Sequence, residues 1–157
     1  MNARPGAVAC WTVAAIAFIT AAFGEAWLGA DDMLSVGLHA SHMSTRISKP
    51  PGMIAHEGEL SLTGTATYIA CLLAGAACIV ACWASIRGRR RWIWISLACA
   101  LFSIAPVAWF LPKFAQTFGV TLSLGRSFYV YAAGVLAALI GAALSLIRRA
   151  SGSSAAG

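Results

Sequence analysis

The amino-acid sequence predicts an all-α membrane protein, a bundle of four transmembrane helices whose two outer loops are compatible with a small extracellular β-sheet. Three observations predict this class: a low content of charged residues, long apolar runs, and arginines gathered at the ends of alternate runs. Of the 157 residues, 60% are hydrophobic and only 10% are charged, against about 25% charged in a soluble domain. The mean hydropathy of +0.80 agrees with a chain of the membrane class.

Four apolar runs without Asp, Glu, Lys or Arg organise the chain. A helix of about 20 residues crosses a hydrocarbon core of about 30 Å, and lipid requires each backbone to satisfy its own hydrogen bonds. The runs therefore predict α-helical spans in a single domain, residues 1–150. The expected spans are about 7–28, 65–86, 92–111 and 127–147.

The first run also has features of a cleaved signal peptide. It follows Arg4 and ends in small residues near Gly24. Cleavage would leave three spans and place the two termini on opposite sides of the membrane. Because the run is somewhat long for a signal peptide, a first membrane span is the favoured interpretation.

Two outer loops follow, at residues 29–64 and 112–126. The stretches "MLSVGL", "ELSLTG" and "GVTLSLG" alternate apolar and polar residues, which is typical of strands. They predict a sheet contributed by both loops. The small polar tail, residues 151–157, is expected to be disordered.

Arginines indicate the orientation of the spans. The N-terminus, the link between the second and third spans, and the C-terminal segment contain arginines and no acid, whereas all five acids fall on the other side. The positive-inside rule then places both termini in the cytoplasm, in a multi-pass protein of the plasma or inner membrane. Nucleic acid is not an expected partner, because no soluble domain shapes a binding surface. The topology signal is strongest in the link, at Arg87, Arg89, Arg90 and Arg91.

Small residues recur every four positions on two of the predicted helices, which lets another helix approach closely. Packing inside the bundle is the favoured interpretation, and a face for a second copy or another membrane protein is the alternative. Pro106, inside the third span, is expected to kink it. The packing candidates are Ala70, Ala74 and Cys78 in the second span and Ala137 and Gly141 in the fourth.

Histidine and methionine in the first outer loop are candidate ligands for a soft metal. Imidazole and thioether groups suit copper better than structural zinc. Cysteines of the second span, Cys71, Cys78 and Cys82, could receive such an ion, although cysteine as a small packing residue is the commoner case. No cofactor is otherwise expected. The metal candidates are His39, His42, His56, Met43 and Met53.

Two stretches give the chain a resemblance to the claudin and peripheral myelin protein superfamily. "WLGADDMLSVGL" begins the long loop with Trp27 and continues to Gly37 and Leu38, and "LGRSFYVYAAGVLAALIGAALSLIRR" is similar to that family's fourth helix. The resemblance implies a small extracellular sheet, homo-oligomers, and a loop anchored by Trp27, Gly37 and Leu38. The chain departs from the family at His39, where a second tryptophan would stand, and it has no cysteine pair in the loop.

The sequence therefore predicts a non-enzymatic integral membrane protein. It would act by lateral or loop-mediated association, in a claudin-like structural, adhesion or assembly role within the lipid bilayer. Two alternatives remain open: a protein that binds or transports a copper-like metal through the outer loop, and an accessory subunit of a larger membrane complex.

Overall fold

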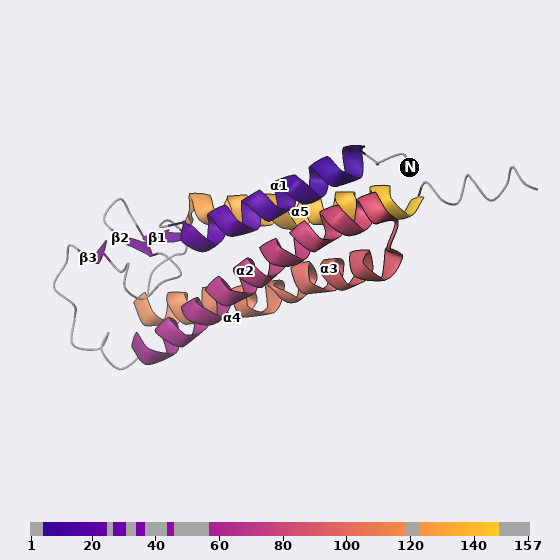
Figure 1. Cartoon of the computed structure of the whole chain (residues 1–157). Coiled ribbons are helices and arrows are strands. Elements are labelled where there is room, and N and C mark those ends of the chain that lie inside the picture. The colour runs from indigo at the N-terminus through magenta and orange to yellow at the C-terminus, as the bar shows by residue number, and fades with distance from the viewer. Residues whose placement is uncertain are drawn as a thin grey trace, which may run out of the picture.

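The computed structural model describes residues 5–24, 27–30, 34–36, 44–45, 57–118 and 123–147. Long helices lie side by side in these segments, and α3 and α4 follow one another as a single interrupted rod (Figure 1). Four helical stretches are long and apolar enough to cross a membrane, which confirms the prediction of a four-helix bundle of that character. The helices are α1 (Pro5–Phe23), α2 (Glu57–Arg87), α3 (Arg90–Phe102), α4 (Ile104–Phe118) and α5 (Arg126–Ile147).

Three boundaries differ from those that the sequence predicts. Helix α1 ends at Phe23 rather than near residue 28, because Leu28 is the first residue of strand β1 (Leu28–Ala30) and pairs with Val36 and Leu124. Helix α2 begins at Glu57, so the expected strand "ELSLTG" is wrong. Its alternation is only six residues long, and there Thr63 and Gly64 are buried in the bundle while Leu62 is exposed, as on a helix face. Helix α4 continues to Phe118 and includes Pro112, which shortens the second loop.

The rod that α3 and α4 form together, the third in chain order, is interrupted at Ser103, between the two helices. Pro106 lies three residues further on, and its nitrogen carries no hydrogen to donate to the carbonyl of Phe102. The proline ring also crowds that carbonyl. The interruption therefore lies where Pro106 removes the helical hydrogen bond.

Helix α1 packs against α5 and α2, α2 also packs against α3 and α4, and α3 reaches α5. Small residues allow these approaches: a Cβ added at Gly134 would lie 3.1 Å from Ala17 Cβ, and one added at Gly75 would lie 2.9 Å from Ile19 Cγ1. The core between the helices is mainly alanine. Large apolar side chains instead point outward from all five helices, as expected where lipid is the solvent.

Short antiparallel strands form a sheet at one end of the bundle (Figure 1). They are β1 (Leu28–Ala30), β2 (Leu34–Val36), β3 (Ser44–Thr45) and β4 (Ser123–Leu124), in the order β3-β2-β1-β4. Strand β1 follows α1, and β4 precedes α5 and pairs with β1 through Leu28 and Leu124. Both loops thus contribute strands, with β2 inside "MLSVGL" and β4 inside "GVTLSLG".

Candidate functional site

Trp27 joins the sheet to the helices. Its side chain is fully buried, and its indole Nε1 donates a hydrogen bond of 2.6 Å to the carbonyl of Ala21 in α1. Its own carbonyl accepts a hydrogen bond of 2.9 Å from the backbone nitrogen of Gly125, which links β4 to α5. One residue therefore connects the end of α1, the start of β1 and the entrance to α5.

Aromatic rings extend this connection into the bundle. The ring centroid of Trp27 lies 5.5 Å from that of Tyr131 and 6.4 Å from that of Phe128, both in α5. Phe18 of α1 meets Tyr131 edge-on, with centroids 5.6 Å apart. Such offset and edge-on pairs each contribute about 0.5–1.5 kcal/mol beyond the area they bury. We call these four residues, Phe18, Trp27, Phe128 and Tyr131, the aromatic anchor.

The aromatic anchor reaches the interruption between α3 and α4. The hydroxyl of Ser103 donates to the carbonyl of Ala100 at 2.6 Å, and the Tyr131 hydroxyl lies 2.9 Å from Ser103 Oγ. With its hydrogen directed to Ala100, Ser103 accepts from Tyr131. The sheet is thus connected through Trp27 and Tyr131 to Ser103, the residue between α3 and α4.

A second polar cluster lies near the other end of the bundle. Ser145 of α5 donates to the carbonyl of Gly141 at 2.7 Å and accepts from Trp11 Nε1 of α1 at 3.5 Å. Ser85 of α2 lies 3.3 Å from the same Ser145 hydroxyl. These contacts bring α1, α2 and α5 to one point, so each end of the bundle has its own hydrogen-bonded junction.

The packing candidates lie at different depths. Ala74 and Cys78 are fully buried, whereas Ala70 and Ala137 are half-buried. Gly141 faces α1, and a Cβ added to it would lie 3.2 Å from the Trp11 ring. At Gly141, the row of small residues on α5 therefore contacts α1 of the same chain.

The metal candidates and two loop candidates lie outside the described residues: His39, His42, Met43, Met53 and His56, together with Gly37 and Leu38. Within the described segments, no group of three or more His, Cys, Asp or Glu side chains is placed to hold a metal ion. The copper hypothesis for the loop is therefore still a prediction.

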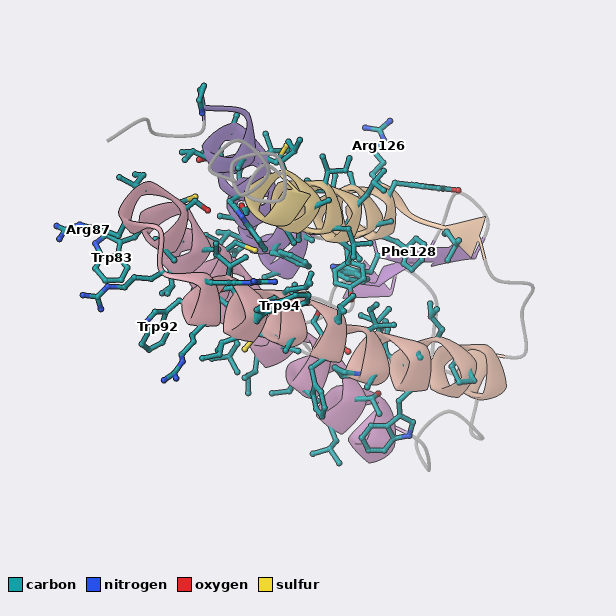
Figure 2. The ribbon with its side chains drawn as sticks, turned by 90° about the vertical axis from the view of Figure 1, so that its right-hand side faces the viewer. Trp83, Arg87, Trp92, Trp94, Arg126 and Phe128 are labelled. Carbon is teal, nitrogen blue, oxygen red and sulfur yellow. The ribbon has the colours of Figure 1, made fainter. Side chains whose placement is uncertain are left out.

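The arginine link lies at the end of the bundle away from the sheet, and its four arginines are exposed. Two of them make cation–π contacts with a tryptophan: the guanidinium carbon of Arg87 lies 5.6 Å, and that of Arg89 5.0 Å, from the ring centroid of Trp83. Figure 2 shows Trp83, Arg87 and Trp92 projecting from the same side of the α2–α3 hairpin.

Sequence reasoning singled out Trp27, but not Phe128 and Tyr131, which its ring meets, nor Ser103 and Phe18, which contact Tyr131. One signal was present, because a serine and a tyrosine within apolar spans need hydrogen-bond partners in lipid. Which residues they would meet depends on how the rods pack, and the one-dimensional pattern does not contain that information.

Four helical stretches are candidate membrane spans by their length and composition, which is the character of a multi-pass membrane protein. Within the described segments, every buried side-chain nitrogen or oxygen has a hydrogen-bond partner. Comparisons with protein-family models, with curated proteins and with solved structures find no match to the chain.

Proposed function

We propose that the protein is a non-enzymatic component of the cell membrane that acts by association, through its sheet end, with a second copy of itself. Both termini and the arginine link lie on the cytoplasmic side in this proposal, and the sheet lies outside. The aromatic anchor is the observation that supports this proposal, because the hydrogen bonds of Trp27 connect the sheet to both α1 and the start of α5. A sheet held in this way presents a fixed surface to a partner.

The packing of the helices favours the sheet end over a lateral helix face. Gly75, Gly134 and Gly141, which could let another protein approach closely, meet α1 of the same chain. Exposed positions of α2 and α5 carry bulky aliphatic side chains such as Leu73, Leu136 and Ile140. Such side chains contact lipid about as well as they contact protein, so they give little reason for helices to associate.

The order of the strands supplies a means of association. Strands β3 and β4 are the outer strands of the sheet, and an outer strand can pair with an added strand through backbone hydrogen bonds. The resemblance to the claudin and peripheral myelin protein superfamily supports the same proposal, since it implies an extracellular sheet and homo-oligomers.

Self-association can be measured by energy transfer between labelled copies of the full chain in lipid vesicles. Trp27→Ala should lower the transfer, because it releases the sheet from α1 and α5. Trp109→Ala is the matched control: it removes a tryptophan that is 48% exposed on α4. Both variants should keep the helical content of the unaltered protein.

Two results would contradict the proposal. One is a monomeric unaltered protein at every protein-to-lipid ratio, and the other is an equal loss of transfer in both variants. Association that needs a different membrane protein, recovered by co-purification, would favour the accessory-subunit alternative.

The orientation has a separate test. Arg91 is exposed at the arginine link and Arg126 is exposed at the start of α5, at the sheet end. With Arg126→Cys, a membrane-impermeant thiol reagent should label intact cells, and with Arg91→Cys only opened cells. The reverse pattern would overturn the orientation. Labelling of both variants in intact cells would show that no membrane span separates the two positions.

A further inference from the structure

The turn between α2 and α3 holds two arginines in a defined geometry. Gly88 has φ of 69°, a left-handed conformation that favours glycine, and the Arg89 nitrogen donates a 2.9 Å hydrogen bond to the carbonyl of Ala84. This is the bonding pattern of a Schellman helix end. It fixes the direction in which the chain leaves α2, and it places Arg87 and Arg89 on either side of one glycine.

Trp83 then orders both side chains. Arg87 and Arg89 hold their guanidinium groups 5.6 and 5.0 Å from the centroid of its ring. Stacking restrains a planar guanidinium while its N–H edge remains free to bind a phosphate through two parallel hydrogen bonds. Trp83 is itself 41% exposed and Trp92 43% exposed, on the same side of the hairpin (Figure 2).

Within the described residues, the positive charge of this turn has no acidic residue beside it. All five acids of the sequence lie between positions 25 and 59, in the segment from the end of α1 to the first turn of α2. Glu57 and Glu59, the acids among the described residues, lie in the first turn of α2, at the opposite end of that helix from the arginine link, Arg87, Arg89, Arg90 and Arg91. Two of these arginines also open α3, whose first turn contains no acid, and there they face the positive end of the helix dipole. An anion at the turn would offset both unfavourable terms.

We propose that Trp83, Arg87 and Arg89 bind the phosphate headgroup of an anionic phospholipid, whose acyl chains lie along the apolar surface beside Trp92. Lipid is the partner that fits, because exposed apolar residues of α2 and α3 flank the arginines in sequence. Ile86 is 47% exposed and Ile95 is 51% exposed. A charged group with attached acyl chains can satisfy both parts of this surface. The proposal relies on the membrane placement given above and is independent of self-association.

Lipid selectivity can be measured with the full chain in phosphatidylcholine vesicles that contain brominated phosphatidylglycerol or brominated phosphatidylcholine. Bromine on the acyl chains quenches nearby tryptophan, so stronger quenching by phosphatidylglycerol reports selective binding. We expect Arg87→Gln and Arg89→Gln each to lower the selectivity about fivefold, the factor for a surface interaction of about 1 kcal/mol per basic residue. Arg126→Gln, an exposed arginine at the sheet end, is the matched control and should leave the selectivity unchanged.

The double variant Arg87→Lys/Arg89→Lys distinguishes a specific phosphate-binding site from general attraction of anionic lipid to positive charge. Lysine keeps the charge but lacks the planar group that stacks and binds phosphate at two points, so the selectivity should fall. Full selectivity in this variant, or in the double glutamine variant, would overturn the proposal. So would an equal loss in Arg126→Gln, or displacement of the lipid by glycerol phosphate in solution, which would identify a free phosphate as the ligand. Trp27→Ala should retain the selectivity even where it abolishes self-association, so the two proposals can fail separately.

Discussion

The substitution Gly24→Ala tests how closely α1 and α5 meet beneath the sheet. A Cβ added at Gly24 would lie 2.7 Å from the Cβ of Ser127, in the first turn of α5, and would overlap the Ser127 hydroxyl as well. Carbon atoms pack at about 3.5 Å or more, so one helix must move by about 0.8 Å. A Cβ atom cannot rotate away as the end of a long side chain can, and the backbone itself has to shift.

The expected cost can be worked out from two terms. Overpacking at a site of this kind destabilises by about 1–3 kcal/mol. Replacing glycine by alanine also restricts the unfolded chain, which returns about 0.4–1 kcal/mol. We therefore expect a net loss of about 1–2 kcal/mol in the free energy of unfolding, since the overpacking term is the larger.

Reversible unfolding in mixed micelles, with a rising fraction of denaturing detergent, measures this free energy. Gly6→Ala, in the first turn of α1, is the control, because its Cβ would meet Leu144 Cδ1 at an ordinary 3.7 Å; it should be neutral or slightly stabilising. In a Ser127→Gly background, which removes both obstructing atoms, Gly24→Ala should lose its cost. If it destabilises equally in both backgrounds, the reasoning from this contact is refuted.

Three further experiments test the aromatic anchor and the interruption between α3 and α4, by the same unfolding measurement or by amide exchange. Trp27→Ala should destabilise by about 3–5 kcal/mol, as for a buried tryptophan, and Trp109→Ala by about 0.5 kcal/mol or less; equal losses would contradict the anchor. A double-mutant cycle with Ser103→Ala and Tyr131→Phe should give a coupling of about 1 kcal/mol, and additivity would show that their 2.9 Å contact contributes nothing. In Pro106→Ala, the new amide should be protected from hydrogen exchange by the carbonyl of Phe102, and fast exchange would assign the interruption to another cause.

The four spans could be predicted from sequence because their evidence is local. Each apolar run is nearly free of charge, and no other backbone conformation satisfies its own hydrogen bonds in lipid. The interruption near Pro106 is local for the same reason, since a proline acts on the carbonyl four residues before it. By contrast, "ELSLTG" shows how a short alternation fails: six residues fit a strand and one face of a helix almost equally well, and the continuation into α2 decides the outcome.

The aromatic anchor could be predicted only in part. Trp27 stood out at the start of the loop, yet its contacts with Phe128 and Tyr131 join residues from the two halves of the chain. The contact of Ser103 is harder still to predict, because its hydrogen bond to Tyr131 exists only where the rod of α3 and α4 approaches α5. Such contacts depend on the arrangement of the rods, and the sequence of any one rod is compatible with several arrangements.

The positions of the two hydrogen-bonded junctions explain how an alanine-rich bundle can have one defined arrangement. In lipid, burial of apolar surface does little to bring helices together, and rows of alanine and glycine permit close approach without fixing how far one helix slides along another. Hydrogen bonds and large buried rings do fix it, because they are lost when the helices slide. Trp11 with Ser145 sets the position of α1 against α5 at one end, and Trp27 sets it again at the other. A change at either junction should therefore loosen the opposite end less than its own, whereas a change in the alanine rows between them should loosen both.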